Sequence, residues 1–452
     1  MARKKISLST TQIILLSFLI TIFAGSILLS LPISTADGKP LSYIDALFTA
    51  TTATCVTGLV TVPTATAWST FGHVVILLLI QIGGLGIVTI MSGVMMLLNR
   101  KMGIGDRLLI QDAFNLNTMS GLTRFVRNVL AGTLIVELTG ALLYMTVFVP
   151  KFGLRGIWIS VFNAVSAFCN AGIDIIGQNS LCDYATHPII NLTTCLLIVL
   201  GGLGYIVWWD VLRVLHTRSR RNHHFFRHLT LHSKIAITST FVLIVAGGLL
   251  MLLLEYNNPA SIGNLSFFDK LQVAFFQSVT TRTAGFASIP QENLTNAGAL
   301  SSLVLMVVGG SPVGTAGGIK TVTVITLLCS AWATIRGKNY ASVFHRTITV
   351  ASIRKAVAVV SAFVAIMLTS TILLSVCTEA DALDILYESV SATATVGLSR
   401  NLTSSLNLWG KLVVIITMYF GRVGPISLAV ALGSTNEPQN LISNPPEEIC
   451  IG

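Results

Sequence analysis

Long apolar stretches, each close to the length of a membrane-spanning helix, recur along this chain. A helix that crosses the hydrocarbon core of a bilayer needs about 20 predominantly apolar residues. The stretches run through residues 13–32, 74–98, 129–149, 189–215, 235–254, 300–334, 356–376 and 412–432, and the sixth is interrupted after residue 308. The pattern predicts an all-α polytopic membrane protein with eight transmembrane helices.

A shorter segment rich in serine and threonine lies between the two long stretches of each successive pair. These segments cover residues 43–54, 157–168, 268–281 and 383–393. They are too short and too polar to span, so we expect them to enter the membrane and turn back. Non-helical backbone at membrane depth is tolerated only where it is buried in protein or lines a water-filled cavity. Four such segments therefore predict one shared cavity.

Each short segment ends at a glycine in a similar local sequence. The glycines Gly58, Gly172, Gly285 and Gly397 follow one another at intervals of 114, 113 and 112 residues, each with an aromatic residue ten positions earlier. Constant spacing of a shared motif indicates internal repetition. We expect four fused helix–pore loop–helix repeats around one central pore. Their expected bounds are 1–120, 121–230, 231–345 with a broken second helix, and 346–452 with a short cytoplasmic tail.

Composition and charge support a membrane protein and predict its orientation. The chain is 53% apolar and only 10% charged, with mean hydropathy +0.79, whereas about a quarter of a soluble domain is charged. Nineteen of the 28 basic residues fall at the N-terminus and in the connections between repeats. Because cytoplasmic loops collect lysine and arginine, both termini are expected inside the cell and the glycine motifs at the outer side of a cell membrane. This bias also explains the net charge of +10 without nucleic acid.

No motif of a known enzyme class is recognisable. The sequence has no CxxC pair, HExxH, Walker loop or Ser-His-Asp arrangement, and its seven cysteines, an odd number, do not suggest a disulfide scaffold. We expect no enzymatic activity and no cofactor bound by this chain.

The glycine motifs fit the chemistry of a cation filter. A cation that crosses a bilayer exchanges its water shell for oxygen ligands, which rings of backbone carbonyls can supply. Glycine allows the unusual dihedrals that such loops need. The alternative is four ordinary turns, which the regular spacing disfavours. The expected ion-binding residues are Val56, Thr57, Gly58, Asn170, Ala171, Gly172, Thr283, Ala284, Gly285, Thr395, Val396 and Gly397.

The third repeat carries a candidate gate. Five glycines and a proline lie together between residues 309 and 318, and proline inside a helix removes a hydrogen bond and clashes with the preceding turn. We expect this helix to break within the membrane. Lys320 and Arg422 are charged residues at comparable depth, where charge is costly and usually functional. The candidate gate comprises Gly309, Gly310, Ser311, Pro312, Val313, Gly314, Thr315, Ala316, Gly317, Gly318, Lys320 and Arg422.

Three further positions have competing interpretations. The glycine clusters 83–86 and 201–204 are expected to serve close helix packing. Glu137, inside a long apolar stretch, is interpreted as half of a buried structural pair, with an ion site as the alternative. Arg282, next to the third motif, is interpreted as packing or pairing behind the loop.

Taken together, the four motifs resemble those of the Trk/Ktr/HKT superfamily of potassium translocators. The first repeat begins without the additional leading helices of Trk-type subunits, so the resemblance is strongest to the Ktr-type pore subunits. Glycine at all four motif positions implies potassium as the transported ion. The resemblance also implies that 309–318 is an intramembrane gating loop and that Arg422 restricts flow.

The resemblance further implies two partners. These are a second copy of the chain in a homodimer and a cytosolic RCK-type ring, on which a nucleotide (ATP/ADP or NAD) is expected. The tail 433–452 and the basic linkers would offer the docking surface. A cation symporter, coupled to sodium or protons, is the alternative function, since broken helices also build transporter sites. A structural membrane scaffold is a third, which would leave the motifs without a cause.

Overall fold

The computed structural model describes residues 9–98, 103–113, 121–217 and 225–424. Within these ranges the chain is helical, as predicted, except for two paired strands of two residues, β1 (Ser342–Val343) and β2 (Arg346–Thr347). The expected docking tail and both termini lie outside the described residues.

Among the described residues, four long single helices are apolar and long enough to cross a membrane. They are α1 (Thr10–Leu29), α7 (Leu122–Phe152), α11 (Leu231–Glu255) and α15 (Val350–Cys377). Each has large apolar side chains that are half or more exposed, such as Phe23 on α1, Leu142 on α7 and Phe241 on α11. Such a surface suits lipid rather than water.

Short helices occupy all four of the expected serine- and threonine-rich segments. They are α2 (Tyr43–Cys55), α8 (Leu154–Cys169), α12 (Phe267–Thr280) and α16 (Ala382–Ala394). Each packs against the long helix that precedes it in the sequence. Their C-terminal halves are almost entirely buried, so each helix ends in the interior.

The helices that follow the glycine motifs are bent or broken. α4 (Thr70–Leu85) meets α5 (Ile87–Leu97) at 99°, and α9 (Pro188–Leu203) meets α10 (Tyr205–Thr217) at 94°. In the third repeat, α13 (Asn296–Val307) and α14 (Thr321–Ile335) flank an irregular segment. In the fourth, α18 (Leu408–Val423) is followed by Gly424, the last described residue.

The apolar stretches 74–98 and 189–215 therefore each form a bent pair of helices that together are apolar and long enough to cross a membrane. Gly86 (φ 84°, ψ 137°) and Gly204 (φ 86°, ψ 142°) interrupt them with a backbone conformation that only glycine adopts without steric cost. The packing interpretation holds for their neighbours Gly83 and Gly201, because a side chain at either would collide with the carbonyl of Thr54 or Phe168. These clusters thus serve both packing and bending.

Short elements connect the main helices. They are η1 (Pro32–Ser34), α3 (Thr64–Ala67), α6 (Ile104–Ala113), η2 (Cys182–Tyr184), η4 (Phe225–His228), η5 (Gln291–Asn293) and α17 (Leu402–Ser405).

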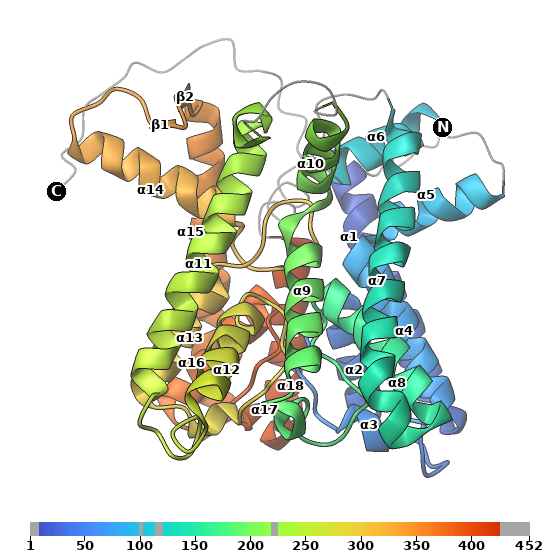
Figure 1. The fold of residues 1–452 in the computed structure, drawn as a ribbon. Coiled ribbons are helices and arrows are strands. Elements are labelled where there is room, and N and C mark those ends of the chain that lie inside the picture. The colour runs from blue at the N-terminus through green and yellow to red at the C-terminus, as the bar shows by residue number, and fades with distance from the viewer. Residues whose placement is uncertain (1–8, 99–102, 114–120, 218–224, 425–452) are drawn as a thin grey trace.

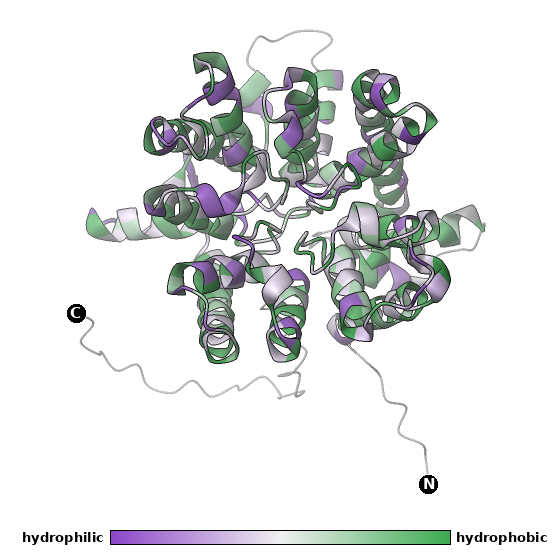
Figure 2. Ribbon diagram, turned by 90° about the horizontal axis from the view of Figure 1, so that it is seen from below, coloured by the Kyte–Doolittle hydropathy of each residue, from purple (hydrophilic) through white to green (hydrophobic). Residues whose placement is uncertain are grey.

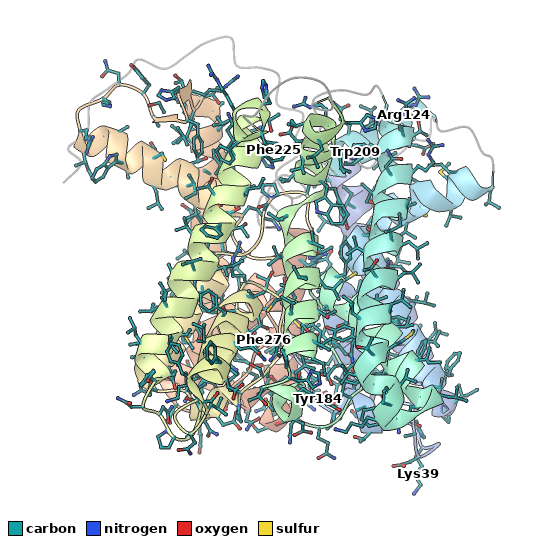
Figure 3. The ribbon with its side chains drawn as sticks, viewed as in Figure 1. Lys39, Arg124, Tyr184, Trp209, Phe225 and Phe276 are labelled. Carbon is teal, nitrogen blue, oxygen red and sulfur yellow. The ribbon has the colours of Figure 1, made fainter. Side chains whose placement is uncertain are left out.

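The helices surround a centre where irregular segments meet (Figure 2). In Figure 1, α6, α10, α14 and the two strands lie at the top, and the short helices α2, α8, α12 and α16 lie in the lower half. Arg124 and Lys39 mark the opposite ends (Figure 3). The described parts of the basic connections thus gather at the end away from the short helices.

Candidate functional site

The four motif glycines form a closed ring. A Cβ added to Gly58 would lie 2.6 Å from the carbonyl oxygen of Ala171, and one added to Gly172 would lie 2.7 Å from that of Ala284. A Cβ on Gly285 would lie 2.5 Å from the oxygen of Val396, and one on Gly397 would collide with that of Thr57. Each glycine therefore faces the carbonyl of the residue just before the glycine of the next copy. The fourth glycine faces the carbonyl of Thr57 in the first copy, so the four contacts form a closed ring.

The same backbone turn leads into the ring in all four copies. Two residues before each glycine stands a residue with positive φ, between 51° and 66°, and the glycines themselves have φ between 63° and 101°. The residues in the earlier position are Val56, Asn170, Thr283 and Thr395. A non-glycine residue with positive φ is uncommon, and strain of this kind persists only where the surroundings hold it. Four equivalent instances indicate a shared geometric requirement for this turn.

Hydroxyl groups of the short helices hold three of the loops by accepting backbone N–H groups. Thr52 Oγ1 accepts from Gly58 N at 2.9 Å, and Ser391 Oγ accepts from Gly397 N at 3.0 Å. In the second copy Ser166 Oγ accepts from Ile173 N at 3.2 Å.

The third loop is held differently. Its hydroxyl residue, Thr280, is one position nearer the glycine, and its Oγ1 donates to the carbonyl of Phe286 at 2.7 Å. With this one-residue shift, the hydroxyl of the third copy donates a hydrogen bond to the loop, whereas the hydroxyls of the other three copies accept one.

A cavity of about 340 Å³ lies next to the ring, on the side of the short connecting elements. It is lined by all four glycines and by Asp174 and Glu292. Burial raises the pKa of Asp174, which lies in the irregular segment after α8, to about 6. Two acidic side chains thus line the mouth of the ring, and a charged carboxylate there attracts cations.

The irregular segment between α13 and α14 lies on the other side of the ring. Its two ends are joined, because Gly309 N donates to the Ile319 carbonyl at 3.0 Å and Ile319 N donates to that of Val307 at 3.0 Å. Near the C-terminal end of the segment, Gly317 N donates to Thr283 Oγ1 at 3.0 Å, which places it directly against the third motif. A Cβ on Gly317 would also lie 2.6 Å from the carbonyl of Ala394, just before the fourth motif.

Backbone groups at the bend of the second repeat anchor this segment. Ser311 N donates to the Gly202 carbonyl at 2.8 Å, and Thr315 N donates to that of Gly201 at 3.1 Å. Tyr205 N, the first amide after the bend, donates to the Val313 carbonyl at 3.0 Å. The bend at Gly204 exposes the groups that hold the segment. Sequence reasoning missed this role, although the Gly-Gly-Leu-Gly cluster recurs at 83–86 and 201–204.

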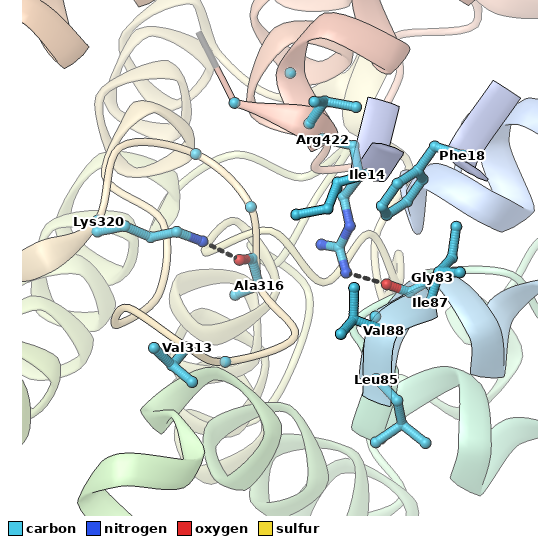
Figure 4. Close-up of a pocket in the computed structure, with 18 of the residues that line it drawn as sticks. Ile14, Phe18, Gly83, Leu85, Ile87, Val88, Val313, Ala316, Lys320 and Arg422 are labelled. Atoms are coloured by element: carbon cyan, nitrogen blue, oxygen red, sulfur yellow. Dashed lines mark hydrogen bonds between the residues drawn. The ribbon is translucent and has the colours of Figure 1, made fainter. Parts of the chain in front are cut away.

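Arg422 ties the segment to the first and fourth repeats. Its guanidinium donates to the carbonyls of Thr315 and Gly83, both at 2.6 Å. Lys320 Nζ donates to the Ala316 carbonyl at 2.5 Å, and both cations line a cavity of about 370 Å³ (Figure 4). Arg422 and the predicted gate residues are thus brought together, with two cationic side chains beside the segment.

The other candidate residues lie close to this assembly. Arg282 is buried and donates to the Gly309 carbonyl at 3.0 Å, so it packs between the third motif and the irregular segment. Glu137 is buried and accepts a hydrogen bond from Gln81 Nε2 at 3.2 Å. Among the described residues, its hydrogen-bonding partner is thus the neutral amide of Gln81. Among the described residues, no three histidine, cysteine or acidic side chains gather as a metal site.

Comparison with known proteins gives concordant matches over nearly the whole chain. Residues 4–442 match the TrkH family, described as cation transport proteins. The chain is 38% identical to Ktr system potassium uptake protein B of Bacillus subtilis, over 99% of this chain and 98% of the relative. It is also 38% identical to potassium/sodium uptake protein NtpJ of Enterococcus hirae, over 98% of each. The crystal structure of the potassium transporter TrkH from Vibrio parahaemolyticus aligns with a TM-score of 0.75 at 16% identity, covering 96% of this chain and 86% of that one.

Proposed function

Because this chain belongs to the TrkH family of cation transport proteins, a family of non-enzymatic membrane transporters, we propose that it carries potassium into the cell. The ion passes through a filter formed by the four glycine motifs, and the segment 309–318 gates the passage. Both the first and the second relative above are named for potassium uptake. The four fused repeats, with the bounds expected above, would surround this one pore.

The observation that carries the proposal is the closed ring of glycines and carbonyls. Carbonyl oxygens that alternate with glycines around an axis are the ligands that replace the water shell of a cation. Each short helix also directs its C-terminal end, the negative end of the helix dipole, toward this ring, which favours a cation there. Residues without side-chain charge can therefore bind the ion and still release it.

The gating role rests on the place of the segment and on its anchors. The backbone of 309–318 lies against the third and fourth motifs. In that position it would obstruct the exit from the ring. Its connections are hydrogen bonds to backbone groups, to the Thr283 hydroxyl and to the guanidinium groups of Arg282 and Arg422, which can break and re-form without unfolding a helix. A local change of order would then open the passage.

Regulation requires partners in this proposal. The chain would act as a homodimer on a cytosolic ring of nucleotide-binding subunits, with its basic connections facing the cytoplasm. The relative named as part of a Ktr system supports a multi-component assembly. A cation symporter is the second candidate, because the name of one relative includes sodium as well as potassium.

Uptake of rubidium-86 into proteoliposomes tests the proposal. Potassium should compete with the tracer much more strongly than sodium, and the cytosolic ring with its nucleotide should raise the rate. Uptake that follows the potassium gradient and is independent of sodium and proton gradients supports a gated pore. Uptake against the potassium gradient, driven by either of the other two, identifies a symporter instead.

A further inference from the structure

A buried polar network joins the third filter loop to the short helix of the fourth repeat. Gln277 Nε2 in α12 donates to Gln291 Oε1 at 2.6 Å, and Tyr387 OH in α16 donates to the same oxygen at 3.0 Å. Gln291 begins η5, six residues after Gly285. All three side chains are at least 98% buried.

The network has no loose end at Gln291. Its Nε2 donates to the Ile289 carbonyl at 2.8 Å and to Gln277 Oε1 at 3.3 Å. Its own carbonyl accepts from Arg400 Nη1 at 3.2 Å, and Arg400 pairs with Asp384 at 2.6 Å. A buried network that is fully satisfied favours one arrangement strongly, because losing one partner leaves a desolvated polar group.

The shared repeat does not require these side chains. Gln277 stands three residues before the hydroxyl residue Thr280, where the other copies have Thr49, Asn163 and Glu388 before Thr52, Ser166 and Ser391. Tyr387 stands ten residues before its glycine, where the others have phenylalanine. The same short helix therefore packs in the other repeats without the tyrosine hydroxyl and with other polar side chains in place of Gln277. A role specific to the contact between the third and fourth loops explains their presence.

We propose that Gln291, held by Gln277 and Tyr387, is a positioning residue for ion discrimination. The network fixes the chain beyond Gly285 against α16, which ends at the fourth motif. Because the network lies between α12, η5 and α16, it sets the spacing between the carbonyls of the third and fourth loops. Discrimination between potassium and sodium depends on that spacing and on how far the carbonyls can move. The inference rests on the proposed function, because it assigns a determinant of selectivity to the same filter.

Tyr387→Phe is the primary test, since it removes one hydroxyl and leaves the ring. We expect the ratio of potassium to sodium competition for rubidium-86 uptake to fall several-fold. The matched control is Tyr144→Phe, which removes an equally buried hydroxyl that bonds Thr194 Oγ1 at 2.6 Å between α7 and α9. The control should lower the unfolding temperature to a similar degree and keep the wild-type ratio.

Gln291→Leu and the double variant with Tyr387→Phe test whether the two act together. Since the hydroxyl acts through Gln291, the double variant should be no less selective than Gln291→Leu alone. Arg400→Gln releases the same loop from its less buried side and carries the test if a core variant fails to reach the membrane. If the wild type is selective and either Tyr387→Phe or Arg400→Gln keeps the wild-type ratio of potassium to sodium competition, this inference is wrong and the proposed function stands. A wild type without preference for potassium overturns the proposed function itself.

Discussion

Gly58 and Gly397 combine a positive φ with a neighbour that leaves no space for a side chain. A side chain in left-handed backbone costs roughly 1–2 kcal/mol before any collision. We therefore expect Gly58→Ser and Gly397→Ser to lower the preference for potassium over sodium by roughly tenfold, the factor that about 1.4 kcal/mol produces. Competition with rubidium-86 uptake measures it.

The control for these variants must lie near the filter and tolerate a side chain. Gly177→Ala meets both needs, because Gly177 lines the outer cavity and a Cβ there has nothing within 4 Å. Gly84 is unsuitable, since a Cβ would lie 2.5 Å from Cys169 Sγ. Wild-type selectivity in both serine variants would be incompatible with the filter assignment.

Arg422 acts through geometry as well as charge, because its two nitrogens reach two carbonyls from different repeats. Arg422→Gln should raise the uptake rate without the cytosolic ring and weaken the effect of that ring. Arg422→Lys keeps the charge but loses the planar fork. If the hydrogen bonds to the two carbonyls are the main effect, Arg422→Lys will behave like Arg422→Gln. If it behaves like wild type, electrostatic repulsion of the cation is the cause.

At the scale of elements, the bends at Gly86 and Gly204 form a matched pair. Their φ and ψ values differ by only a few degrees. A Cβ on Gly86 would meet nothing closer than 3.8 Å, whereas one on Gly204 would collide with the Pro312 carbonyl in the proposed gate. Gly86→Ala should therefore cost only backbone strain, roughly 1–3 kcal/mol. Gly204→Ala should cost more and also change the uptake rate.

Thermal unfolding and rubidium-86 uptake on both variants separate these contributions. Equal uptake rates in the two would show that contact between the bend and the segment has no part in gating.

The irregular segment can be shortened without moving its flanking helices. Gly309 and Gly318 adjoin each other, since a Cβ on Gly318 would lie 3.0 Å from Gly309 N. Deleting residues 310–317 should thus preserve α13 and α14, raise the uptake rate and reduce its dependence on the cytosolic ring. A folded deletion variant with wild-type rate and full dependence would make the segment a structural break only.

At the largest scale, the proposed filter depends on contacts between all four glycine motifs. An ion that binds the assembled ring stabilises the folded chain by mass action, by about 2.7 kcal/mol at one hundred times its dissociation constant. Potassium and rubidium should raise the unfolding temperature in detergent more than sodium does at equal ionic strength. Gly397→Ser should abolish this difference. Equal stabilisation by all three ions in the wild type would argue against a selective site.

Much of this organisation could be predicted because it is written in local patterns. Apolar length predicted the long helices, and serine- and threonine-rich segments predicted the positions of α2, α8, α12 and α16. The proline and glycines after α13 predicted a break there. The bends at Gly86 and Gly204 could not be predicted in this way, because an apolar glycine-containing run suits a straight packed helix equally well.

The all-helical class and the recurrence of the glycine motif follow from the sequence alone, because the apolar length and each copy of the motif are local patterns along the chain. The folded chain was needed to establish which carbonyl each glycine faces and that Arg422 bridges Thr315 and Gly83. It also decided that Gln291 joins two repeats. These contacts link residues far apart in the sequence. Their partners are set by how the four repeats close into a ring, and no local pattern encodes that closure.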